Sequence, residues 1–182
     1  MTAPRVSGSD PAVSRDRDTA GRARNARPRD ALGRPLARDA TGIPPLAADQ
    51  VLPAAEALQT AQHLLDADRP FDAHEVLEAA WKAAPPAERD LWQGLAQLAV
   101  GLTHAHRGNA RGATALLRRG AKRLEGYPDT GPHDVDVRGL RARSAELATR
   151  IEVTGLVGLS PDALSLRLCA PAAGPSRPGS PG

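Results

Sequence analysis

The sequence predicts an all-α protein, a compact bundle of about five helices with disordered N- and C-terminal tails. Alanine and leucine dominate its apolar residues and favour helix, whereas β-branched residues, which favour sheet, are few. The four aromatic residues, Phe71, Trp81, Trp92 and Tyr127, lie within one stretch of the chain, where we expect the core. Proline and glycine residues divide this stretch into segments of helical length.

The helices are predicted in chain order from their apolar spacing and from the residues that begin or end them. Asp49 is expected to cap the first helix, Pro70 lies in the first turn of the second, and Pro85-Pro86 ends it. A Gly108-Asn109 turn separates the third helix from the fourth, and Asp136 is expected to cap the fifth. The predicted helices are 50–67, 70–84, 87–106, 110–125 and 137–152.

Residues 155–168 have two interpretations. Ser160-Pro161 can begin a short helix, because serine caps helices and proline is tolerated in a first turn. Leu164-Ser165-Leu166-Arg167-Leu168 alternates apolar and polar residues, and this segment can instead lie extended. The sequence leaves both open.

The distribution of charge and apolar residues predicts three parts: a disordered arginine-rich arm over 1–46, a helical bundle domain over 47–155, and a mostly disordered tail over 156–182. The net charge is +3, and residues 1–40 hold nine arginines and five aspartates. The basic character therefore belongs to the arm, where interleaved aspartates dilute the positive field. We expect no nucleic-acid partner for this arm.

The cysteine count and the hydropathy pattern indicate the cellular location of the protein. Cys169 is the one cysteine, so no disulfide can form within the chain, which suits a reducing cytosol. No apolar run follows the N-terminal arginines, as a secretory leader requires. The longest mostly apolar stretch, Leu91–Ala105, is too short and too polar to span a bilayer. We expect a cytoplasmic protein with no membrane partner.

The second predicted helix places polar residues at the edge of its apolar face. At about 100° per residue, Ala73, Val76, Leu77, Ala80 and Ala84 form the apolar stripe, and Trp81 lies at its edge. His74 lies beside Trp81, and Glu78 follows His74 by one turn. A neighbouring helix can cover this border. The simpler interpretations are an ion pair of Glu78 with Lys82 and a border histidine bonded to a carboxylate.

The third predicted helix carries no Asp, Glu, Lys or Arg from Leu91 to His106, which indicates a central position covered on most sides. Gln93, Gln97 and His104 form the stripe opposite its leucines. If this stripe is buried, its polar groups need partners, and the second helix offers His74 and Glu78. The alternative is that the three side chains face water.

These residues predict a polar cluster, with Trp81 and Trp92 as candidate walls. His74, Glu78 and His104 are a candidate ligand set for a metal, and His74, Glu75, Glu78 and His104 are candidates for acid–base catalysis. The pattern lacks the second histidine of the zinc-protease motif His-Glu-x-x-His and the Glu-x-x-His units of di-iron bundles. No nucleophile has a recognisable context, and no glycine-rich phosphate loop is present, so the cofactor stays unknown.

The fourth predicted helix has an arginine- and lysine-rich face but no interleaved aromatic residues on which bases can stack. A solvated helix face accounts for this pattern, and we expect no nucleic-acid binding here.

A combination of motifs resembles a known family. The motifs are Phe71-x-Ala73-His74-Glu75-x-Leu77-Glu78-x-x-Trp81, Gln93-Gly94-x-x-Gln97-x-Ala99, His104, and Gly108-Asn109-x-x-Gly112-Ala113-x-x-Leu116-Leu117. Over about residues 57–127 they resemble domain-of-unknown-function family 309 of bacteria and archaea. The resemblance implies a helical bundle in which the His-Glu helix packs on the Gln-Gly-Gln helix, and it implies no reaction. Its recurrent polar positions are His74, Glu75, Glu78, Gln93, Gln97, His104 and Asn109.

Two functions follow from these observations. The first is a helical binding or interaction module whose partner is another protein or a second copy of the chain, and in which the polar cluster serves structure and specificity. The alternative is a small metal-dependent or acid–base enzyme, hydrolase-like, that uses His74, Glu78 and His104. The sequence names neither a substrate nor a metal.

Overall fold

The computed structural model describes residues 51–170 together with residues 30, 34, 36 and 37. The described chain forms five α-helices, which confirms the predicted all-α bundle. Short 3₁₀ turns follow or precede several of them. The helices are α1 (Ala54–Asp66), α2 (Pro70–Ala83), α3 (Arg89–His106), α4 (Ala110–Arg123) and α5 (Val137–Thr154).

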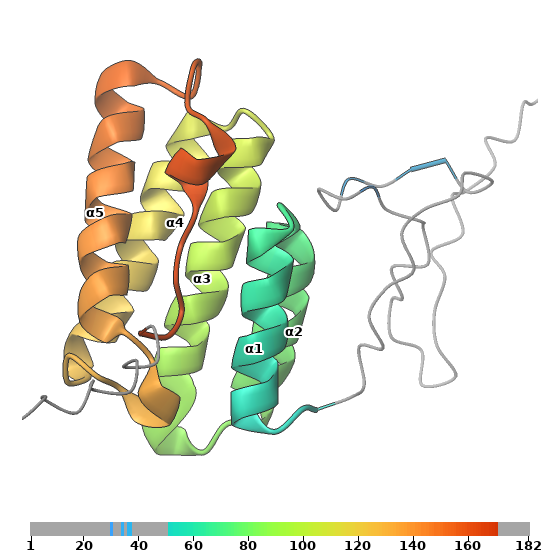
Figure 1. The fold of residues 1–182 in the computed structure, drawn as a ribbon, viewed down its shortest axis with the longest axis vertical. Helices are drawn as coiled ribbons and strands as arrows, with labels where there is room; N and C mark the ends of the chain where they lie inside the picture. Colours follow the sequence, from blue (N-terminus) through green and yellow to red (C-terminus); the bar gives the residue numbers. More distant parts are fainter. Residues whose placement is uncertain (1–29, 31–33, 35, 38–50, 171–182) are drawn as a thin grey trace, which may run out of the picture.

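The helices pack in chain order, α1 on α2, α2 on α3, α3 on α4, and α4 on α5, and α3 lies in the middle of the bundle (Figure 1). Most residues of α3 are buried, as its lack of charged residues from Leu91 onward predicts. Two glycines bring α3 and α4 together, because a Cβ built on Gly120 of α4 lies only 2.9 Å from the carbonyl oxygen of Gly94 on α3.

Local capping residues set several helix ends. The Asn109 side chain accepts a hydrogen bond from the Gly112 N–H at the start of α4, and Asp136 accepts one from the Gly139 N–H at the start of α5. The Asp136 cap is as predicted. Helix α1 begins after Pro53 without a side-chain cap, and Asp49 lies outside the described residues. Helix α3 begins at Arg89, later than expected, because Pro86–Glu88 form a 3₁₀ turn.

Both interpretations of residues 155–168 hold, each for a part of the segment. Ser160 caps a 3₁₀ turn over Pro161–Leu164, and the chain then extends with Leu164, Leu166 and Leu168 buried and the residues between them exposed. We call residues 161–169 the strap. It runs across the bundle between α1 and α5 (Figure 1).

The strap corrects the domain boundary expected at residue 155. Leu164, Leu166 and Leu168 belong to the hydrophobic core, and the Leu168 carbonyl accepts a hydrogen bond from the Asp136 N–H at 2.9 Å. Residues 156–168 therefore lie against the bundle rather than in a mostly disordered tail, because burial of alternate leucines stabilises an extended segment. Residues 171–182, and the 1–46 arm apart from its four described residues, lie outside the described part of the chain.

Candidate functional site

Helices α2 and α3 carry a row of half-buried polar and aromatic side chains. Glu78 and Trp81 follow His74 by four and seven residues on α2, and the members on α3 recur at similar intervals. Each of these side chains is partly exposed, so the border position predicted for His74 and Glu78 is the observed one. We call this row the α2–α3 polar band, and its members are His74, Glu78, Trp81, Gln93, Gln97 and His104.

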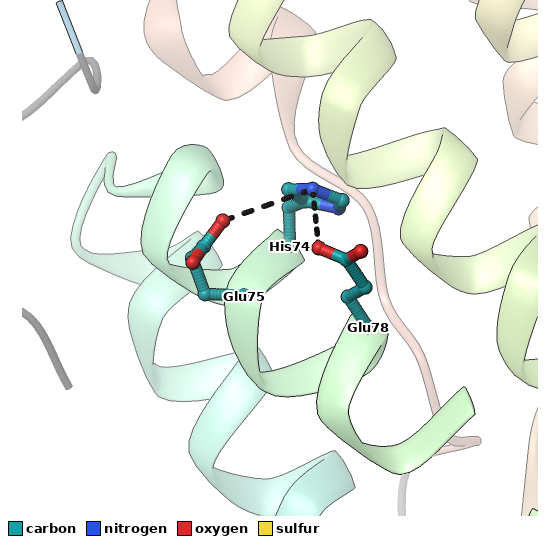
Figure 2. Close-up of side chains that lie close together, drawn as sticks. All are labelled: His74, Glu75 and Glu78. Atoms are coloured by element: carbon teal, nitrogen blue, oxygen red, sulfur yellow. Dashed lines mark ion pairs between the residues drawn. The ribbon is translucent and has the colours of Figure 1, made fainter. Parts of the chain in front are cut away.

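One turn of α2 brings an imidazole and two carboxylates together (Figure 2). Nε2 of His74 lies 3.4 Å from Oε2 of Glu78 and 3.9 Å from Oε1 of Glu75. The other Glu78 oxygen, Oε1, lies 3.0 Å from Nζ of Lys82, which is the ion pair considered for Glu78. Exposed fractions of 21% for His74, 30% for Glu78 and 42% for Glu75 place the group at the edge of the protein rather than inside it.

The opposite edge of the His74 ring faces into the protein. Its Nδ1 is buried and has no hydrogen-bond partner. The Phe71 ring lies 6.3 Å from the His74 ring, and the Arg107 guanidinium lies 5.8 Å from the centre of the Phe71 ring. The Phe71 ring lies beside the imidazole but does not satisfy Nδ1.

A second buried polar atom without a hydrogen-bond partner lies on α3, the helix that packs against α2. Oε1 of Gln97 on α3 is buried and has no hydrogen-bond partner, although Gln97 as a whole is partly exposed. An unpaired buried polar group costs about 1–3 kcal/mol, so two on neighbouring helices are a local deficit in stability. The sequence predicted that Gln93, Gln97 and His104 would either be buried with partners or face water. They are half-buried, and no hydrogen bond within the described chain joins them to His74 or Glu78.

His104 has a different partner from those considered. Its Nδ1 accepts a hydrogen bond from Nδ2 of Asn109 at 2.8 Å, while Oδ1 of Asn109 caps α4. In the described chain, the compact group of potential metal-ligand atoms, all within 4.8 Å of one another, comes from His74, Glu75 and Glu78. His104 is not among them, so the structure does not assemble the expected set of His74, Glu78 and His104.

A cluster of hydrogen-bonded side chains at the start of α3 is not predicted by any sequence motif. His133 Nε2, at 2.9 Å, and Trp92 Nε1, at 3.1 Å, both donate to Oε2 of Glu88. These two hydrogen bonds, from His133 first and then Trp92, hold the pKa of the Glu88 carboxyl below its usual value, against burial, which raises it. Trp92 is buried against His133, so its ring nitrogen serves this cluster. His133 lies 45 residues from Glu88, and no sequence motif links them.

The loop that carries His133 is strained. His133 and Asp134 have φ values of 59° and 60°, in the left-handed region that non-glycine residues rarely adopt. Nearby, burial raises the pKa of the Cys169 thiol, and the charges of Asp134 and Asp136 add to this effect. A raised thiol pKa means little thiolate at neutral pH, so Cys169 is a poor nucleophile.

An open cavity of about 320 Å³ lies apart from the polar band, between the strap and the ends of α1 and α3. Its lining contains none of the band residues. The residues that line it include Leu65, Asp68, Leu102, His106, Asp162 and Arg167.

Comparison with known proteins agrees with the resemblance seen in the motifs. Residues 58–116 match the model of a family described as a domain of unknown function, DUF309. Over 56 residues the chain is 43% identical to the uncharacterised protein YpuF of Bacillus subtilis (strain 168). That match covers 30% of this chain and 32% of YpuF, so the chain spans about a third of this relative. No solved structure matches the chain significantly.

None of the helices in the described part of the chain has the length and apolar character that a membrane crossing requires.

The matched segment begins within α1 and ends within α4, so it contains every residue of the α2–α3 polar band together with Asn109. The resemblance predicted over about 57–127 is thus confirmed for residues 58–116, which match the DUF309 family model.

Proposed function

We propose that this chain is an α-helical binding module that contacts a protein partner through the α2–α3 polar band. The observation that carries the proposal is the band itself, a row of half-exposed polar and aromatic side chains on two packed helices. Aromatic side chains such as Trp81 are enriched at protein interfaces, and the half-exposed polar groups beside it can hydrogen-bond to a partner.

The partner's chemistry follows from the carboxylates of Glu78 in the band and of Glu75 beside it. Their side chains are 30% and 42% exposed, and ionised carboxylates accept hydrogen bonds. The band therefore suits a partner segment that presents hydrogen-bond donors, such as backbone N–H groups or basic side chains.

The enzyme alternative receives less support from the geometry. His104 bonds to Asn109 instead of joining His74 and Glu78, and the one cysteine has a raised pKa. A binding module with one cysteine and no disulfide is suited to the cytoplasm, which is where we expect it to act.

The proposal is tested by crosslinking inside the cell of origin. A photoreactive amino acid replaces Glu75, which is 42% exposed beside the band, and in a control it replaces Arg150, which is exposed on α5. We expect a discrete crosslinked protein from position 75 that is absent from position 150. Its identity is read by mass spectrometry, and a crosslink to the chain itself identifies a homo-oligomer.

The affinity of the identified partner is then measured for two matched variants. Gln97→Ala removes a half-exposed side chain of the band, and Gln59→Ala removes the same side chain from an exposed position on α1. We expect Gln97→Ala to weaken binding about tenfold, the effect of losing roughly 1.4 kcal/mol. Equal crosslinking at both positions, or unchanged affinity of the Gln97→Ala variant, would contradict the proposal.

A further inference from the structure

Three side chains on one turn of α2 bring potential metal-ligand atoms close together. We propose that His74, Glu75 and Glu78 form a site for one divalent transition-metal ion of the zinc class. The proposal goes beyond the binding-module function and does not depend on it. It differs from the ligand set expected from the sequence, because Glu75 takes the place of His104.

Two of the three separations between the ligand atoms are close to those that such an ion requires, and all three atoms lie within 4.8 Å of one another. Zinc binds histidine nitrogen and carboxylate oxygen at about 2.0–2.2 Å, so two ligands at a tetrahedral angle lie about 3.4 Å apart. Nε2 of His74 and Oε2 of Glu78 are already 3.4 Å apart. The distance from Nε2 to Oε1 of Glu75 is 3.9 Å, about 0.5 Å longer than the tetrahedral edge, and a small rotation of an exposed side chain closes it.

The local charge also favours a cation. Two carboxylates face the imidazole, while Lys82 binds Oε1 of Glu78 and leaves Oε2 turned toward His74. Glu78 can therefore bind an ion through one oxygen while Lys82 holds the other. The ammonium group lowers affinity for the ion through repulsion, which predicts that removing it strengthens binding.

The donor set selects the class of ion. One imidazole nitrogen and two carboxylate oxygens suit zinc and its transition-metal neighbours, whereas magnesium and calcium prefer oxygen ligands alone. The three ligands come from about one turn of α2, so a single helix supplies them all. Open positions for water remain on the solvent side, because the Glu75 side chain is 42% exposed.

A metal bound to Nε2 requires the His74 proton on Nδ1, and metal-bound histidines almost always donate this proton to a nearby acceptor. Nδ1 of His74 is buried and has no hydrogen-bond partner in this structure, so metal binding requires an acceptor to move toward it.

The experiment is a calorimetric titration of the full chain, freed of any histidine tag, with Zn²⁺ and separately with Mg²⁺. We expect one equivalent of Zn²⁺ to bind and to raise the melting temperature, since a ligand that binds the folded state stabilises it. We expect no binding of Mg²⁺ under the same conditions. Glu75→Gln and His74→Ala should each weaken Zn²⁺ binding at least about tenfold, and Lys82→Met should strengthen it.

The matched control is His63→Ala, which removes an exposed histidine of α1 outside the group and should leave Zn²⁺ binding unchanged. Circular dichroism of each variant verifies the fold, and the exposed Glu75→Gln change provides a test even if His74→Ala unfolds. The inference is overturned if wild type gives no binding heat and no melting shift, or if His63→Ala loses as much affinity as Glu75→Gln. A failed titration leaves the crosslinking test of the binding module unaffected.

Discussion

Asn109 links the end of α3 to the start of α4, because its Nδ2 donates to Nδ1 of His104 at 2.8 Å while its Oδ1 accepts from the Gly112 N–H at 2.9 Å. One side chain thereby caps a helix and fixes an imidazole ring. The tight fit extends to Gly112, where an added Cβ would lie 2.5 Å from the same His104 nitrogen. This hydrogen-bonded corner holds His104 at the end of the α2–α3 polar band.

Asn109→Ala should lower the free energy of unfolding by about 1–2 kcal/mol, because it removes both the N-cap and the bond to His104. Chemical denaturation monitored by circular dichroism measures the loss. Asn109→Asp is the matched control, since its carboxylate keeps the cap and lacks the amide donor. We expect Asp to recover most of the lost stability, and an equal loss in both variants would show that the His104 bond, not the cap, dominates.

The sequence predicts those features of the fold that depend on neighbours along the chain. The helices follow from apolar spacing, and the Asp136 cap follows from its position before an apolar run. The His74, Glu78 and Lys82 contacts also follow, because residues four apart on a helix are neighbours.

Contacts between distant residues could not be predicted in this way. A helical wheel gives the direction of Gln97 but not its rotamer, so it could not show that Oε1 is left without a partner. His104 was expected to turn toward α2, but Asn109 offers a hydrogen bond only five residues away. The position of the strap depends on Gln62, which is 106 residues from Leu168, and no local pattern indicates that pairing.

Glu88→Gln should alter the pH dependence of stability. Hydrogen bonds from His133 and Trp92 lower the pKa of Glu88 in the folded protein, so its stabilising contribution is fully present above the usual carboxyl value of 4.5 and is lost as pH falls through the lower, folded value. We expect the variant to be less stable than wild type by about 1 kcal/mol at pH 7. Urea unfolding between about pH 3 and 7 should show this difference shrinking at the acid end.

Glu56→Gln, an exposed change in the first turn of α1, is the control for that series and should track the wild-type profile. A difference between wild type and Glu88→Gln that grows as pH falls would contradict the assigned direction of the Glu88 pKa shift.

Gly120→Ala should destabilise the contact between α3 and α4. The new Cβ would lie 2.7 Å from Cδ2 of Leu98 and 2.9 Å from the Gly94 carbonyl oxygen, and the backbone oxygen cannot rotate away. The helices must separate, at a cost of about 1–3 kcal/mol that outweighs a helix-propensity gain of up to about 1 kcal/mol. Thermal unfolding measures the net loss. Gly126→Ala is the control, because no atom lies within 4 Å of its added Cβ, and an equal effect in both would refute the steric explanation.

Gln62→Ala should release the strap from α1. Oε1 of Gln62 accepts from the Leu168 N–H at 2.8 Å, and its Nε2 donates to the Leu166 carbonyl at 3.1 Å. Loss of both bonds leaves two strap backbone groups without their partners, which costs about 1–3 kcal/mol. Leu166 and Leu168 stay apolar and favour burial, so we expect the strap to open more often rather than to detach.

Hydrogen exchange distinguishes this local opening from global destabilisation. In Gln62→Ala the Leu168 amide should exchange faster by a larger factor than amides in the centre of α3, because its acceptor is removed directly. Gln59→Ala changes an identical side chain at an exposed position on the same helix and should leave the Leu168 amide protected. If exchange at Leu168 and in α3 accelerates by the same factor, the strap and the helices unfold as one unit, and Gln62 stabilises the whole bundle instead of the strap alone.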